Sequence, residues 1–93
     1  MRFSFFRRRL RRRPDLRFTL FTRQGCHLCD HAAAILTKAR ERHGFTMDTK
    51  DVDTAPEWVA AYGECVPVVL VNGKVRFRGQ VNEVLLQRIL DHE

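Results

Sequence analysis

The sequence lacks any long apolar run, and it has few cysteines. No stretch of its 93 residues approaches the roughly 20 apolar residues of a membrane-spanning helix. It also lacks the apolar run and small-residue cleavage site of a secretory signal. Three cysteines, two of them in a C-x-x-C motif, are too few for the disulfide framework of a small secreted protein. We therefore expect a soluble domain in a reducing compartment, the cytoplasm.

Acidic residues are missing from the first thirteen positions, which contain seven arginines. The formal net charge of the chain is +6, so subtracting these seven charges leaves residues 14–93 at −1. The basic character therefore belongs to an N-terminal arm and says nothing about the folded surface. We expect residues 1–14 to form a basic, disordered arm, because like charges repel in compact forms, and residues 15–93 to form a single domain.

The arm also contains large apolar residues, and Phe3, Phe6 and Leu10 would share one face of a helix. Such a pattern in residues 2–13 is compatible with weak contact to an anionic membrane or to a nucleic acid. The alternatives are a solvated tail, residues upstream of the true start, or a short organelle-targeting segment. The sequence alone leaves all of these open.

The motif Gly25-Cys26-His27-Leu28-Cys29 follows the apolar run at residues 18–21 and opens a helical pattern. A cysteine pair three residues apart at a strand-to-helix junction is typical of redox sites. The unpaired N–H groups of the helix start favour thiolate over thiol at the first position, so Cys26 is the candidate nucleophile. Cys29 lies almost one turn further on the same face and is the candidate resolving thiol.

Apolar periodicity and turn signals predict seven elements in the order βαβαββα. The expected strands are residues 17–22, 45–52, 67–71 and 74–78, and the expected helices are residues 27–43, 56–62 and a last one capped by Asn82. The helix between the first two strands makes a right-handed βαβ unit. Asn72-Gly73 is the turn of a β-hairpin. No internal repeat or low-complexity segment follows the arm.

Three motifs carry a resemblance to a known family: F-T-R-Q-G-C-H-L-C at residues 21–29, C-V-P at residues 65–67 and G-Q-V-N-E at residues 79–83. In the order and spacing of these motifs, residues 17–91 resemble glutaredoxin-like proteins of the thioredoxin-like superfamily. The resemblance implies an α/β architecture, the thioredoxin-like fold, with a four-stranded mixed sheet flanked by helices. It places the dithiol at the end of the first strand.

The resemblance also implies a set of substrate contacts around the dithiol. Pro67 matches a cis-proline, which turns the backbone of Val66 toward the site to pair with a bound peptide or glutathione. Without the family, Pro67 is an ordinary proline at the start of a strand. Arg23 matches a lysine that meets a glutathione carboxylate. The Val81 N–H and the Asn82 side chain match contacts to the γ-glutamyl group.

The chain departs from the family pattern at two places. His27 and Leu28 stand between the cysteines, where the family commonly has proline and tyrosine. Cys65 stands where the family usually has threonine or another residue without a thiol, and the fold would place it close to Cys26. There it could form an alternative disulfide, help to ligate a metal, or compete with Cys29 for oxidation. Equally, it is a small, half-buried apolar residue.

These observations favour a small thiol-disulfide oxidoreductase that reduces protein disulfides or mixed disulfides with glutathione. We expect no bound cofactor or metal, with glutathione as a co-substrate and a reductant of the glutathione or thioredoxin type. One alternative is a metal or iron–sulfur module that uses Cys26, Cys29 and Cys65 as ligands, although the four ligands of a usual zinc site are missing. Another alternative is an interaction domain that binds through its basic arm and only senses the redox state.

Overall fold

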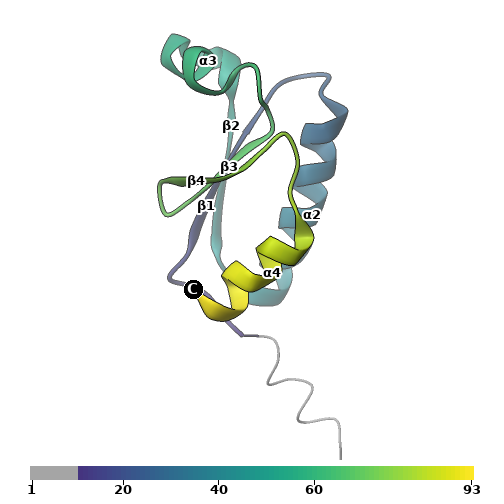
Figure 1. The fold of residues 1–93 in the computed structure, drawn as a ribbon, viewed down its shortest axis with the longest axis vertical. Helices are drawn as coiled ribbons and strands as arrows, with labels where there is room; N and C mark the ends of the chain where they lie inside the picture. The colour runs from purple at the N-terminus through teal and green to yellow at the C-terminus, as the bar shows by residue number, and fades with distance from the viewer. Residues whose placement is uncertain (1–10) are drawn as a thin grey trace, which may run out of the picture.

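The computed structural model describes residues 11–93, and its elements follow the predicted order. The strands are β1 (Arg17–Thr22), β2 (Thr46–Asp51), β3 (Val68–Val71) and β4 (Lys74–Arg78). The helices are α2 (His27–His43), α3 (Pro56–Tyr62) and α4 (Glu83–His92), with a short 3₁₀ helix, η1 (Val52–Thr54), between β2 and α3 (Figure 1). Within residues 11–93, no helix is long and apolar enough to cross a bilayer. Most of the predicted arm, residues 1–10, lies outside the described residues.

The four strands form one mixed sheet in the order β2-β1-β3-β4. The central strand β1 pairs in parallel with β2 and antiparallel with β3. Strands β3 and β4 form the predicted hairpin, whose turn residues Asn72 and Gly73 both have positive φ, 51° and 83°. Helix α2 supplies the crossover that a parallel pair requires. The predicted α/β fold, a four-stranded mixed sheet flanked by helices, is confirmed.

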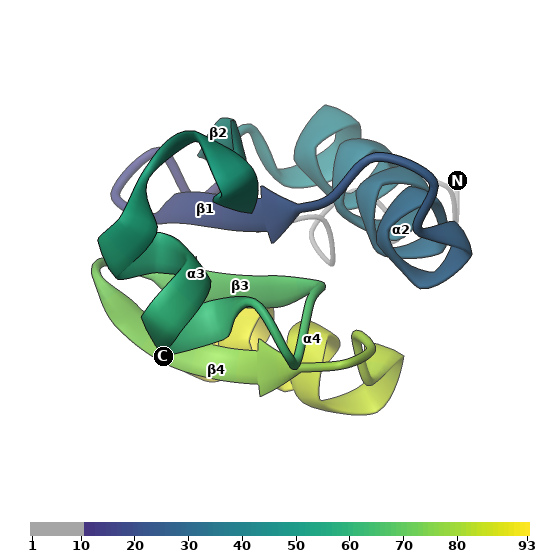
Figure 2. The same ribbon diagram turned by 90° about the horizontal axis from the view of Figure 1, so that it is seen from above.

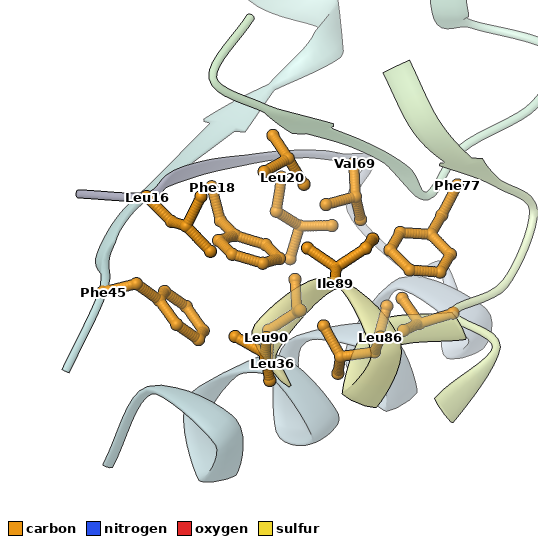
Figure 3. Close-up of a cluster of buried hydrophobic side chains, with 13 residues drawn as sticks. Leu16, Phe18, Leu20, Leu36, Phe45, Val69, Phe77, Leu86, Ile89 and Leu90 are labelled. Carbon is orange, nitrogen blue, oxygen red and sulfur yellow. The ribbon is translucent and has the colours of Figure 1, made fainter. Parts of the chain in front are cut away.

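The hydrophobic core lies between one face of the sheet and helices α2 and α4 (Figure 3). Alternate residues of β1 and β3 point into it, as the two-residue period of a strand requires. The core includes Phe18, Leu20, Val69, Val71 and Phe77 from the strands and Leu36, Leu86, Ile89 and Leu90 from the helices. These buried contacts hold α2, and with it the C-x-x-C motif, in a fixed position against the central strand.

Helix α3 packs over one end of the other face of the sheet, and in Figure 2 it lies in front of the strands while α4 lies behind them. The ring of Phe21 lies 5.2 Å from that of Trp58 and 4.6 Å from that of Tyr62, measured between centroids. Phe21 follows Leu20 in β1 and therefore points away from the main core. Trp58 thus has a packing role, close to the end of the strand that leads to the C-x-x-C motif.

Strand β2 is shorter than the predicted range 45–52 at both ends. Phe45 precedes the strand, and its ring stacks on Phe18 in the core with centroids 4.1 Å apart. Val52 begins η1, because the Asp51 side chain accepts a hydrogen bond of 2.9 Å from the Asp53 N–H and turns the chain. Both differences come from contacts that apolar alternation does not report.

Arg13 belongs to the folded domain, although the arm was predicted to extend to residue 14. Its buried guanidinium donates hydrogen bonds to the carbonyl oxygens of Ile89, at 3.0 Å, and Leu90, at 2.8 Å. Its backbone N–H donates to the carbonyl oxygen of His43 at 2.7 Å. The C-terminal ends of α2 and α4 carry partial negative charge, which favours a guanidinium there. The domain therefore begins earlier than the predicted boundary.

Candidate functional site

Cys26 and Cys29 are joined by a disulfide at the start of α2, with their Cα atoms 5.2 Å apart. Cys29 is only 1% exposed, whereas Cys26 is half-buried. The loop after β1 carries Cys26 to the N-cap position of α2, where its extended backbone ends the loop and its carbonyl starts the helix. One sulfur of the pair is thus reachable from solvent and the other is shielded.

The start of α2 directs one backbone donor at the Cys26 sulfur. The N–H of Cys29 donates to the Cys26 Sγ at 3.1 Å, and the N–H of Asp30 donates to the Cys26 carbonyl at 3.1 Å. The first N–H groups of a helix carry partial positive charge and have no carbonyl partner within the helix. When the disulfide is reduced, this position therefore favours negative charge on the Cys26 sulfur.

The two residues between the cysteines lie at the surface. His27 is exposed, and the side chain of Leu28 is 55% exposed although it is apolar. Leu28 is therefore one of the few large apolar side chains that the described part of the chain leaves in solvent. Its position places an apolar contact surface next to the disulfide.

The Val66–Pro67 peptide bond is cis, the isomer that the family resemblance implies. The N–H of Gly79 donates to two carbonyl oxygens of this segment, that of Cys65 at 2.9 Å and that of Pro67 at 2.8 Å. Among the backbone hydrogen bonds that residues 11–93 form outside helices and strands, none uses the N–H or C=O of Val66. The end of β4 thus fixes the residues on both sides of Val66.

Arg23 forms a bidentate ion pair that the sequence did not predict. Its Nε and Nη2 donate to the two carboxylate oxygens of Asp53 at 2.9 and 2.8 Å, and its Nη1 donates to the carbonyl oxygen of Gly63 at 2.8 Å. The hydrogen bond with Arg23 lowers the pKa of Asp53, and the same bond raises the pKa of Arg23. Contact with a glutathione carboxylate would therefore require Arg23 to release or share its bonds to Asp53.

The third cysteine is a free thiol of intermediate burial. The Cys65 Sγ donates to the carbonyl oxygen of Tyr62 at 3.5 Å and accepts from the guanidinium of Arg78 at 3.4 Å. Within residues 11–93, no three His, Cys, Asp or Glu side chains are grouped so that they could hold a metal ion. Cys65 therefore does not join Cys26 and Cys29 in a ligand set in this conformation. The contact with Arg78 was not expected, since nothing in the spacing of these two residues indicates it.

The last predicted contacts, Val81 and Asn82, lie where the chain enters α4. The Val81 side chain is buried in the core, which leaves its backbone as the group available to a substrate. The Asn82 side chain caps α4, because its Oδ1 accepts a hydrogen bond of 2.9 Å from the N–H of Leu85. Asn82 therefore has the structural role that its position before an apolar helix predicts.

Comparison with known proteins adds the family. Residues 17–91 match the model of the Glutaredoxin-like domain (DUF836). Uncharacterized proteins of Mycobacterium tuberculosis and Mycobacterium bovis are 38% identical to this chain over 69 residues, which cover 69% of it and 71% of each relative. These relatives therefore align with more than two thirds of the chain.

Solved structures agree in fold. A structural genomics target protein from X. campestris has a TM-score of 0.67 and 29% identity, covering 82% of this chain and 97% of that one. A mutant thioredoxin from Halobacterium salinarum has a TM-score of 0.63 and 21% identity, covering 82% and 72%, and at that identity the likeness shows the fold alone. With the family model spanning nearly the whole folded part, this chain belongs to the glutaredoxin-like domain (DUF836) family, and it has the thioredoxin-like fold.

Proposed function

We propose that the protein is a small thiol-disulfide oxidoreductase that reduces protein disulfides or mixed disulfides with glutathione. The observation that carries the proposal is the Cys26–Cys29 disulfide at the start of α2, in which Cys26 is reachable and Cys29 is shielded. A reachable sulfur and a shielded partner are what a two-step exchange needs. Membership of the glutaredoxin-like family supports the same class of chemistry.

The exchange begins from the reduced protein. The Cys26 thiolate attacks one sulfur of the substrate disulfide, a new S–S bond forms, and the other substrate sulfur leaves and takes a proton from water. The Cys29 thiol then loses its proton and attacks the Cys26 Sγ. The second substrate sulfur leaves and is protonated, and the Cys26–Cys29 disulfide remains. Two electrons have passed to the substrate, and two glutathione molecules or one dithiol protein of the thioredoxin type return them.

The backbone of Val66 is the proposed binding site for the substrate peptide. In the described part of the chain, no backbone hydrogen bond outside the helices and strands uses the N–H or C=O of Val66, and the bonds from Gly79 hold the residues on both sides of it. An extended peptide can therefore pair with Val66 in the manner of an added β-strand. The exposed Leu28 would then contact apolar side chains of the same peptide.

Glutathione is the proposed co-substrate, and its contacts would come mainly from the backbone. Arg23 is bonded to Asp53 and Gly63, and the Oδ1 of Asn82 caps α4. The N–H groups of Val66 and Val81 are left as donors for the glutathione backbone. No bound cofactor takes part in these steps. A dithiol that must be reduced again after each cycle belongs in a reducing compartment, and we propose the cytoplasm.

Mass spectrometry of serine variants tests the proposal. The reduced protein is mixed with oxidised glutathione, free thiols are blocked at intervals, and peptides are identified. The parent protein should pass through a glutathione adduct at Cys26 and end as the Cys26–Cys29 disulfide. Cys29→Ser should accumulate the adduct, because the sulfur that displaces glutathione is gone, and Cys26→Ser should form none.

Cys65→Ser is the matched control, since it makes the same substitution at the third cysteine. It should react like the parent protein. If Cys26→Ser still exchanges at the parent rate, or if Cys29→Ser builds up no adduct at Cys26, the proposed roles are wrong. If Cys65→Ser abolishes the internal disulfide, the third thiol takes part and the two-cysteine scheme fails.

A further inference from the structure

We propose that Arg23 is a positioning residue that ties the loop carrying Cys26 to the segment carrying Val66 and Pro67. This inference deepens the proposed function, and its kinetic test rests on that function. It gives Arg23 a role inside the protein, through its bonds to Asp53 and Gly63, rather than a role in direct substrate contact.

Arg23 is bonded to both parts of the site. Its backbone carbonyl accepts the N–H of Cys26 at 3.3 Å, so its main chain is part of the turn that presents the reachable sulfur. Its side chain donates to the Gly63 carbonyl at 2.8 Å, and Gly63 ends α3 just before the segment of Cys65, Val66 and Pro67. One residue thus bridges the two segments that must act on the same substrate.

Asp53 fixes the direction of the guanidinium. Both carboxylate oxygens accept from Arg23, at 2.8 and 2.9 Å, and Asp53 itself is held in η1 through its N–H bond to the Asp51 side chain. The Arg23 and Asp53 side chains are 37% and 49% exposed, so the ion pair adds little to the stability of the fold. Its bidentate geometry instead restricts how the guanidinium can turn. The effect of the pair is therefore on orientation.

Gly63 allows the close approach. A Cβ atom at this position would lie 3.3 Å from the Arg23 Nη2 and 2.6 Å from the carbonyl oxygen of Val59. A side chain there would push against both the last turn of α3 and the guanidinium. The absence of a side chain at Gly63 leaves room for the Arg23 guanidinium beside the Gly63 carbonyl.

Two disulfide substrates distinguish a positioning role of Arg23 from a general loss of activity in the variant. A short peptide disulfide can pair with the Val66 backbone, whereas a small aromatic disulfide offers little beyond its sulfurs. In Arg23→Gln, the rate with the peptide disulfide should fall about tenfold relative to the rate with the aromatic disulfide, because misplacement of Val66 affects only the first. Asp53→Asn should give a smaller loss of the same kind. The double variant should be no slower than Arg23→Gln, because both changes break one link.

Arg76→Gln is the matched control. Arg76 forms a comparable bidentate pair with Glu93, at 2.6 and 3.0 Å, between β4 and the end of α4. Its removal should leave the ratio of the two rates unchanged. Equal loss with both substrates in Arg23→Gln, or a double variant as slow as the product of the single effects, would overturn the positioning role.

Amide hydrogen exchange tests the bridge without any activity. The N–H of Cys65 is bonded to the Tyr62 carbonyl at 3.0 Å, and the N–H of Gly79 is bonded to Cys65 and Pro67. Both amides should exchange faster in Arg23→Gln than in the parent or in Arg76→Gln. Unchanged exchange would refute the bridge whatever the kinetics show. A parent protein that reduces neither disulfide would refute the proposed function. In that case the amide hydrogen exchange alone would show whether Arg23 bridges the two segments.

Discussion

Arg13 reaches the C-terminal end of α4, where its guanidinium donates a hydrogen bond of 2.8 Å to the carbonyl oxygen of Leu90. The same guanidinium donates to the carbonyl oxygens of Ile89 and Glu93 and pairs with Asp15 at 2.9 Å. The Arg13 side chain is 4% exposed, so its charge is satisfied almost entirely by these partners. A residue of an arginine-rich segment is thus part of the scaffold.

Arg13→Ala should lower the free energy of unfolding by about 3 kcal/mol, because it removes a buried charged donor and leaves the carbonyls of α4 without it. Denaturant unfolding followed by circular dichroism measures the change. Arg88→Ala, at an exposed position of α4, should change stability by less than about 0.5 kcal/mol. Equal effects of the two substitutions would show that the Arg13 contacts contribute nothing specific.

Gly63→Ala should also destabilise the fold, by about 2 kcal/mol, since the added Cβ overlaps the Val59 carbonyl and the chain must shift to accept it. Gly73→Ala is a useful comparison, because a Cβ there meets nothing within 4 Å and only the positive φ of 83° opposes it. Thermal unfolding of both variants gives the ranking. A Gly63→Ala protein as stable as the parent would contradict the close approach of the Val59 carbonyl to this position.

Acid should weaken the fold through three carboxylates that accept hydrogen bonds from arginines. The pKa of Asp53 is lowered first by its hydrogen bond with Arg23, that of Asp15 by Arg13, and that of Glu93 by Arg76. A lowered folded-state pKa means that the stabilisation is complete above the unfolded-state pKa, about 4, and is lost as the pH falls through the lower folded-state value. Denaturant midpoints should therefore stay level above about pH 5 and fall below about pH 4.

The variant Asp53→Asn isolates one of these groups. Because the pair with Arg23 is half-exposed, the unfolding midpoint of this variant should be only slightly lower than that of the parent at neutral pH. The difference should shrink as the pH falls below about 4, because the parent carboxylate is then protonated too. A difference that stays constant down to the lowest pH would show that the charge of Asp53 does not contribute.

Contact of residues 2–13 with an anionic membrane or a nucleic acid stays a prediction, and the position of Arg13 changes how it is tested. Deleting residues 2–9 removes Arg2, Arg7, Arg8 and Arg9 and keeps the Arg13 contacts intact. The truncated protein should unfold at the parent midpoint but bind anionic vesicles and DNA only at lower salt. Binding that is unchanged by the deletion, or insensitive to salt, would exclude a role for these arginines.

Much of the fold could be predicted from local signals. The hairpin around Asn72-Gly73, the cap at Asn82 and the cysteine pair at the start of α2 each depend on residues within a few positions of one another. Such signals are read directly from periodicity, capping and turn chemistry. The motifs at residues 65–67 and 79–83 added the long-range part, because the resemblance placed them beside the cysteines.

The contacts that were not predicted join residues far apart in the chain. Arg23 and Asp53 are 30 positions apart, and Arg13 and Ile89 are 76 positions apart. Composition gives no information on which of many arginines pairs with which carbonyl or carboxylate, since that depends on the final packing. For Arg13 the prediction from the arginine-rich start of the chain was wrong. Charge repulsion predicted disorder there, whereas the carbonyl groups at the ends of α2 and α4 accept hydrogen bonds from this residue.

In the sheet order β2-β1-β3-β4, the antiparallel pairing of β1 with β3 joins the two halves of the chain. The first half, through β2, contributes Cys26 and Cys29, and the second half, from β3 onward, follows directly from Pro67 and supplies Gly79. Neither half contains the whole site, so two fragments made by cleavage near α3 should each fail to reduce a peptide disulfide that needs both Cys26 and the Val66 backbone. When the two fragments are mixed, the rate of disulfide exchange that returns would be proportional to the amount of reassembled protein. The chain could therefore be divided into two fragments whose association is measured by this activity.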